Sequence, residues 1–191
     1  YCRGCIRACC VGLSLITLSL VCIAANAFLL VPDGKTWSSD QLSLHVLLMP
    51  GFIGGGLMVR SLEHRPVSRG VGTTIRGSGC EGRGEGKGQR SRRVAIFGML
   101  GAIYCLSVSG VGLRIGPKCS MYGTWDYHFQ ETLGAYLNNY ASWNFCEEPP
   151  NVVPWNVTLF SLLVVASCLE MVLCGIHLVN TFILYFVNMY R

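Results

Sequence analysis

The sequence predicts an all-α membrane protein with four transmembrane helices and a small disulfide-closed outer loop. Two observations carry this prediction. The chain has a mean hydropathy of +0.45 and only 13% charged residues, where a soluble domain has about a quarter. Four apolar stretches are each close to the roughly 20 helical residues that a hydrocarbon core requires: residues 9–31, 42–59, 94–113 and 157–179.

The basic residues are concentrated on one side of these stretches. Segment 60–93 contains nine Lys and Arg residues against three acidic residues, whereas segment 114–156 contains two against four. Loops rich in Lys and Arg stay cytoplasmic. We therefore expect segments 1–8, 60–93 and 180–191 inside and segments 32–41 and 114–156 outside, and the last helix can continue into the tail.

The first stretch, residues 9–31, has two interpretations. Basic residues followed by an apolar run and the small-residue site Ala25-Asn26-Ala27 resemble a cleavable signal peptide. The apolar run continues to Val31, which is longer than a typical signal core. We therefore favour a transmembrane helix that is retained in the protein.

The second stretch, residues 42–59, is marginal as a span. Its length as a helix is about 27 Å, slightly less than a hydrocarbon core, and it contains Pro50. Gly51 and Gly55 have the small-xxx-small spacing that lets another helix approach closely. This spacing indicates either packing within the chain, which we favour, or oligomerisation.

Polar residues inside the predicted spans are few. Glu170 is the one acid among them, and a charged side chain at the membrane centre costs about 2.5–3.5 kcal/mol on insertion scales. We expect Glu170 to face other helices, with Asn26 or His177 as hydrogen-bond partner. A proton or ion pathway would need more than one such group, so structural hydrogen bonding is the favoured interpretation.

The loop between the last two spans contains two cysteines on the side of the membrane where disulfides persist. A bond between Cys119 and Cys146 would stabilise the fold by roughly 3–4 kcal/mol in the chain-entropy model. Asn156-Val157-Thr158 is a sequence for N-glycosylation on the predicted outside. We therefore expect a disulfide and a glycosylation site in this loop.

A run of aromatic and polar residues lies within the same loop: Trp125, Asp126, Tyr127, His128 and Phe129. Aromatic faces beside carboxylates could hold a guanidinium or ammonium group. The run could equally form the core of a disulfide-closed domain or contact another protein. The core interpretation is favoured over protein contact, and protein contact over a small cationic ligand.

The cysteines on the predicted cytoplasmic side are candidates for S-palmitoylation. They are Cys2, Cys5, Cys9, Cys10 and Cys80. The first two form a CxxC motif, but no second pair follows to complete a tetrahedral zinc site. Catalytic motifs are absent from the sequence and its four His residues are scattered, so we expect no enzyme activity, metal, cofactor or nucleic-acid partner. The basic, Gly-rich segment is expected beside anionic lipid.

Several motifs resemble those of the L-six branch of tetraspanin-like proteins, the transmembrane 4 L six family. In the outer loop they are Gly116-Pro117-Lys118-Cys119, Trp125-Asp126-Tyr127-His128-Phe129, Trp143-Asn144-Phe145-Cys146-Glu147-Glu148-Pro149 and Asn151-Val152-Val153-Pro154-Trp155-Asn156. Near the first two spans they are Pro32-Asp33-Gly34-Lys35 and Gly54-Gly55-Gly56-Leu57-Met58. Residues 60–93 and 181–191 depart from the family pattern.

This resemblance implies four spans, cytoplasmic termini, a glycosylated outer loop and palmitoylated cysteines. It also implies a scaffold function in the plasma membrane or in endosomal and lysosomal membranes. Such a scaffold assembles laterally with integrins, tetraspanins and growth-factor receptors and affects adhesion, migration and growth signalling. The alternative that the resemblance suggests is a sensor of free arginine at lysosomal membranes, which would involve residues 125–129.

Overall fold

The structure is a computed structural model that describes two parts of the chain. It describes the backbone of residues 3–55 and 85–190, and their side chains except those of residues 3–12, 33, 85–94 and 188. Most of the predicted basic segment, residues 60–93, therefore lies outside the described residues. Its position beside anionic lipid stays a prediction.

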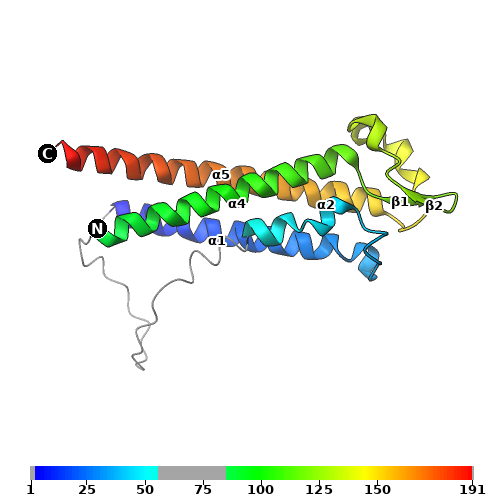
Figure 1. Cartoon of the computed structure of the whole chain (residues 1–191), viewed down its shortest axis with the longest axis horizontal. Coiled ribbons are helices and arrows are strands. Elements are labelled where there is room, and N and C mark those ends of the chain that lie inside the picture. Colours follow the sequence, from blue (N-terminus) through cyan, green and yellow to red (C-terminus); the bar gives the residue numbers. More distant parts are fainter. Residues whose placement is uncertain (1–2, 56–84, 191) are drawn as a thin grey trace, which may run out of the picture.

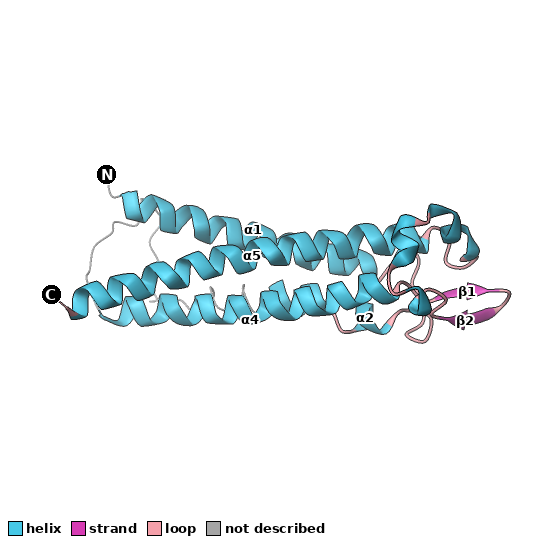
Figure 2. Ribbon diagram, turned by 90° about the horizontal axis from the view of Figure 1, so that it is seen from above, coloured by secondary structure: helices cyan, strands magenta, loops and turns pink. Residues whose placement is uncertain are grey.

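Long helices form a bundle with a small domain at one end. The helices are α1 (Arg3–Leu29), the short α2 (Leu44–Leu47), α4 (Glu85–Ile115) and α5 (Val152–Met189). Figure 1 and Figure 2 show α1, α4 and α5 running lengthwise beside one another, and α5 contacts both of the others. The small domain, here called the outer domain, comprises residues 116–151. It contains β1 (Cys119–Met121), β2 (Thr124–Asp126) and the 3₁₀ turns η2 (Gln130–Thr132), η3 (Ala135–Asn138) and η4 (Tyr140–Phe145).

Two of the described helices contain segments that are long and apolar enough to cross a membrane. Ala95–Ile115 has a mean hydropathy of 1.8 and Val152–Val187 has a mean hydropathy of 2.3. The described apolar parts of the other helices, Leu13–Leu29 and Leu44–Gly55, are shorter. The mostly helical architecture is thus confirmed, whereas the number of four spans stays a prediction.

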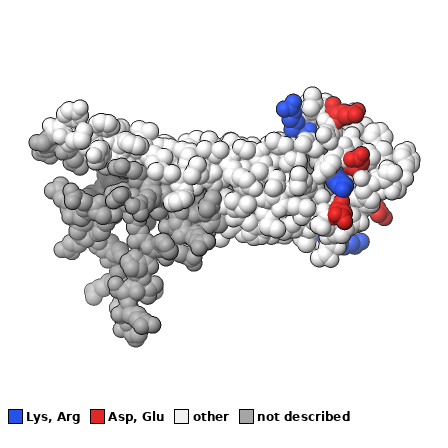
Figure 3. Space-filling model, viewed as in Figure 1, with Lys and Arg blue, Asp and Glu red and all other residues white. Residues whose placement is uncertain are grey.

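The distribution of charge matches a protein that is surrounded by lipid along its helices. Figure 3 shows Lys, Arg, Asp and Glu side chains gathered at the outer domain, while the visible described surface of the bundle carries none. Many exposed residues along the bundle are large and apolar, among them Leu20, Phe97 and Val165. An apolar band of this kind is the surface that a hydrocarbon core favours.

The second predicted span is interrupted. After α2, Met49 has a φ of 48°, and the helix resumes over residues 50–55, here called the glycine helix. Pro50 explains the interruption, because proline has no N–H and its ring disfavours a helical conformation of the residue before it. The hydroxyl of Tyr104 donates to the carbonyl oxygen of Leu48 (2.9 Å) at this point. Residues 42–59 are therefore not one continuous helix.

The glycine helix approaches α1 so closely that side chains cannot fit between them. A Cβ atom on Gly51 would overlap the carbonyl oxygen of Cys22, and one on Gly55 would lie 2.7 Å from the carbonyl oxygen of Ser19. Real Cβ atoms do not approach oxygen atoms this closely, so both positions require glycine. The packing interpretation of the Gly51 and Gly55 spacing is confirmed.

Replacing Gly51 by Ala is expected to destabilise the bundle, because the added methyl group overlaps a backbone oxygen that cannot rotate away. Overpacking of this kind costs about 1–3 kcal/mol. Gly110→Ala is the matched control, since a Cβ atom at Gly110 meets no atom within 4 Å. Thermal unfolding in detergent should show a lower midpoint for Gly51→Ala and an unchanged or higher midpoint for Gly110→Ala. Equal midpoints for Gly51→Ala and the parent protein would contradict this packing.

Candidate functional site

The outer domain is built on a short β-hairpin. β1 pairs antiparallel with β2, and the two connecting residues, Tyr122 and Gly123, have φ values of 51° and 81°. Positive φ at both central positions is the requirement of a type I′ turn, whose twist matches that of the paired strands. The turn places Tyr122 at the tip of the hairpin, where this residue is 88% exposed.

The predicted disulfide between Cys119 and Cys146 is confirmed, with a Cα–Cα distance of 5.6 Å. Backbone hydrogen bonds join the same two segments. The N–H of Ser120 donates to the carbonyl oxygen of Glu148 (2.8 Å), and the N–H of Glu147 donates to the carbonyl oxygen of Ser120 (3.0 Å). The hairpin is therefore fixed to the segment that leads into α5.

Two aromatic rings form the centre of the outer domain. Phe129 and Tyr136 are only 3% and 2% exposed, and their ring centroids lie 4.8 Å apart. The hydroxyl of Tyr136 donates to the carbonyl oxygen of Leu113 (2.7 Å), one of the terminal carbonyls of α4 that have no partner within the helix. Burial raises the pKa of Tyr136 to about 12, so the hydroxyl keeps its proton at neutral pH.

The first outer loop, residues 32–41, and the start of α2 also contact the hairpin. The hydroxyl oxygen of Tyr127 accepts a hydrogen bond from the N–H of Leu44 (2.8 Å), which lies in the first turn of α2. The rings of Trp37 and Trp125 face each other with centroids 6.0 Å apart. These contacts hold the two outer segments together, and sequence reasoning did not identify Trp37 as part of them.

The five predicted ligand-binding residues occupy different environments. Trp125 faces the first outer loop, Tyr127 bonds to the start of α2, and Phe129 lies in the core of the domain. Asp126 is exposed and accepts a hydrogen bond from the adjacent backbone N–H (2.7 Å), while His128 is half-buried. The three aromatic residues Trp125, Tyr127 and Phe129 are thus engaged with three different parts of the protein, and the arginine alternative has no support in this arrangement.

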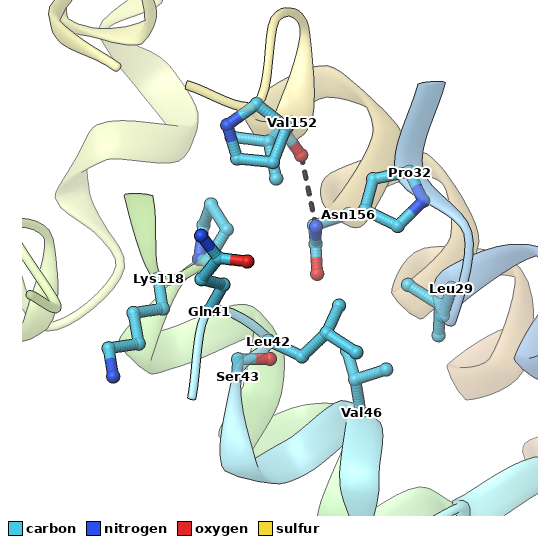
Figure 4. Close-up of a pocket in the computed structure, with 11 residues that line it drawn as sticks. Leu29, Pro32, Gln41, Leu42, Ser43, Val46, Lys118, Val152 and Asn156 are labelled. Atoms are coloured by element: carbon cyan, nitrogen blue, oxygen red, sulfur yellow. Dashed lines mark hydrogen bonds between the residues drawn. The ribbon is translucent and has the colours of Figure 1, made fainter. Parts of the chain in front are cut away.

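A small cavity lies where the first outer loop meets the start of α5 (Figure 4). Its volume is about 10 Å³, far below the several hundred Å³ of a typical ligand pocket. Asn156 projects into it and is 5% exposed; its Nδ2 atom donates to the carbonyl oxygen of Val152 (3.0 Å). The cavity is therefore too small to bind an amino acid.

Asn156 is also the predicted glycosylation site. Nδ2 is the atom that would carry the glycan, and here it is buried and bonded to the first turn of α5. A glycan at this atom would require the side chain to leave the cavity. Glycosylation of Asn156 stays a prediction, and the buried position opposes it.

The polar residues inside the bundle find partners that differ from those expected. Glu170 is fully buried, and the hydroxyl of Ser19 on α1 donates to its Oε1 atom (3.4 Å). The expected partner Asn26 instead accepts a hydrogen bond at Oδ1 from the N–H of Gly51 (2.8 Å). His177 is half-buried, two turns further along α5. Of the two expected partners of Glu170, Asn26 is not one: its Oδ1 atom accepts from the glycine helix, and its buried Nδ2 atom does not reach the carboxylate.

The remaining predicted sites lie at the edge of the described residues. Cys2 and Cys80 are outside them, and Cys5, Cys9 and Cys10 lie on α1 at positions whose side chains are not described. Their palmitoylation stays a prediction. Among the described residues, no group of three or more His, Cys, Asp or Glu side chains could hold a metal ion.

Comparison with known proteins identifies the family. The model of the L6 membrane protein family matches residues 1–191. The chain belongs to the L6 membrane protein family. The resemblance drawn from the sequence is thereby confirmed, and the protein is an integral membrane protein.

The similarity to individual family members covers most of the chain. It is 61% identical over 175 residues to Transmembrane 4 L6 family member 5 of Bos taurus, covering 89% of this chain and 86% of that one. It is 61% identical over 177 residues to the Homo sapiens member 5, covering 90% and 87%. It is 38% identical over 179 residues to Transmembrane 4 L6 family member 1 of Mus musculus, covering 89% and 86%. No solved structure matches the chain.

The stability of the outer domain is expected to fall as the pH rises above about 10. Burial raises the pKa of Tyr136 from 10.0 to about 12, so the folded state holds this proton more tightly than the unfolded chain does. The stabilisation is fully present below the unfolded pKa and is lost as the pH approaches the folded pKa.

Tyr136→Phe tests this expectation. At pH 8 the variant should be less stable by about 0.5–1.5 kcal/mol, because a buried hydrogen bond is lost. Near pH 11 the difference should vanish or reverse, because the variant has no proton to lose. Urea unfolding at both pH values, with free thiols alkylated, measures the difference, and a difference independent of pH would refute the proposed cause.

Proposed function

We propose that this L6 family protein is a four-span membrane scaffold without enzyme activity, which binds other membrane proteins laterally and through its outer domain. The observation that carries the proposal is the exposure of large apolar residues on this domain. Its large apolar residues include several that are exposed to solvent: Tyr122 (88%), Leu133 (65%), Tyr140 (69%) and Phe145 (56%). Other residues fill the core of the domain, so these four are available for contact with a partner protein.

The backbone conformation of Leu133 supports this proposal. Its φ of 49° lies in the left-handed region, which a branched apolar residue rarely adopts. Conformations of this kind store strain and are often found where a residue has a function. Because Leu133 is also exposed, packing within the domain does not account for a large apolar side chain there.

The proposed topology follows from charge and from the disulfide. The outer domain, with its disulfide, faces the outside of the cell or the lumen of an organelle, and the basic segment 60–93 faces the cytoplasm. The partners that fit are membrane proteins with ectodomains close to the bilayer. Integrins, tetraspanins and growth-factor receptors at the plasma membrane are the candidates that the family suggests.

Site-specific photocrosslinking tests the contact surface. A photoreactive amino acid at Tyr140 is expected to crosslink to other membrane proteins in intact cells, because this ring is exposed on the outer domain. The same residue at Asn138, a nearby exposed polar position, is the control and should crosslink less. Crosslinks of equal yield at both positions, or none at Tyr140, would argue against a specific contact surface here.

Thiol labelling tests the topology separately. A cysteine introduced at Tyr122 should react with a membrane-impermeant maleimide in intact cells, because the turn is on the outside. Native Cys80 should react only after permeabilisation, because the basic segment is inside. Labelling of Cys80 in intact cells would show that the second apolar stretch has not crossed the membrane.

A further inference from the structure

The last turns of α5 carry apolar side chains on all sides. In residues 180–190, here called the distal segment, the six consecutive residues from Phe182 to Val187 are each 48–64% exposed. Consecutive helical residues are about 100° apart, so six of them cover the whole circumference of the helix. The sequence has no Asp, Glu, Lys or Arg from residue 171 to residue 190. The distal segment therefore carries no charged side chain, and its large exposed side chains are apolar on every side of the helix.

The packing of α5 against α4 fixes the level of the distal segment. The two helices are antiparallel, and a Cβ atom on Gly175 would lie 3.7 Å from the Cε atom of Met99. Because both helices rise equally per residue, residues 182–189 lie level with roughly residues 85–92 of α4. Figure 1 shows the red end of α5 reaching the start of α4 and extending past it. The sequence of this part of α4 is basic, with Lys87, Arg90 and Arg92.

Basic residues mark the polar boundary of a membrane. The distal segment reaches the level of this boundary without carrying a charged side chain itself. The apolar part of α5, Val152–Val187, has 36 residues. Its length of about 54 Å exceeds the roughly 30 Å of a hydrocarbon core. Exposure of the distal segment to water would be unfavourable, because the six consecutive residues from Phe182 to Val187 all expose large apolar side chains.

We propose that the distal segment is immersed in lipid, in the leaflet opposite the outer domain, as a continuation of the lipid-facing surface of α5. A protein partner would cover one side of the helix, whereas lipid covers all sides. The exposed apolar surface is continuous along the same helix through Val165, Val172 and Val179, each 57–58% exposed. The headgroup regions extend the bilayer to about 40–45 Å, so they contain part of the excess length, and tilting of the helix takes up the rest.

The residue types of the distal segment match the depth that we propose. Aromatic residues are enriched where the hydrocarbon core meets the headgroups, and the segment contains Phe182, Tyr185, Phe186 and Tyr190. The basic residues of α4 at the same level would lie beside the headgroups, where anionic lipids favour them. Both helices therefore place the headgroup boundary at the level of the distal segment.

Nitroxide accessibility measurements on the full chain test the proposal. A spin-labelled amino acid is placed at Leu184 or Phe186 by suppression of a stop codon, which leaves the native cysteines unlabelled. The protein is reconstituted in vesicles of phosphatidylcholine and phosphatidylserine. Val165 serves as the lipid-exposed control and Tyr122 as the water-exposed control.

Lipid immersion predicts high accessibility to oxygen and low accessibility to a neutral nickel chelate at Leu184 and Phe186, as at Val165. High accessibility to nickel, as at Tyr122, would mean that the segment is in water and would overturn the proposal. Low accessibility to both reagents would mean that a protein, such as a second copy of this chain, covers the segment, and would also overturn it. All labels replace exposed residues, so the fold should be retained; unchanged values at the two control positions check this.

Discussion

The close contact between the glycine helix and its neighbours is the constraint on which the bundle depends. Helices in lipid gain little from the hydrophobic effect, so they associate through close packing and polar contacts. The glycine helix has both. Gly54 approaches α4 so closely that an added Cβ atom would lie 2.9 Å from the carbonyl oxygen of Gly101. The N–H of Gly51, in the first turn, has no acceptor within its helix and donates to Asn26 instead. The interruption at Pro50 leaves this N–H without a helical acceptor. It also begins the short helix that carries Gly51, Gly54 and Gly55.

The outer domain is attached to the bundle by hydrogen bonds of a similar kind. In each, an aromatic side chain pairs with a backbone group at a helix end. Tyr136 donates to a carbonyl in the last turn of α4, and Tyr127 accepts from an N–H in the first turn of α2. Within the bundle, next to the outer domain, the indole N–H of Trp155 on α5 likewise donates to the carbonyl oxygen of Phe28 in the last turn of α1 (3.0 Å). Tyr136 also packs against Phe129, and Trp155 against Phe28, so the domain and the helix ends stabilise each other. A partner that binds the outer domain would therefore bind a surface held rigidly on the bundle.

The interior of the bundle favours a structural role over transport. Glu170 and Ser19 join α5 to α1 near the centre of the apolar band. No second carboxylate lies inside the described part of the bundle, whereas a proton or ion pathway needs several such groups in succession. The exposed apolar residues lie on the outer domain and along the lipid-facing helices, which are the surfaces through which a scaffold would act.

The sequence by itself determined the membrane class, the helical architecture, the family and the disulfide between Cys119 and Cys146. Each depends on composition, the length of apolar stretches or motif spacing, which are local properties of the chain. The sequence also indicated that Gly51 and Gly55 allow close packing, but only the tertiary structure decided that α1 is the neighbour that they contact. The tertiary structure also decided that Ser19 rather than Asn26 bonds to Glu170. It placed Trp125, Tyr127 and Phe129 in three different environments. These outcomes depend on how helices and loops far apart in the sequence are rotated and placed against one another, and local patterns do not specify those rotations.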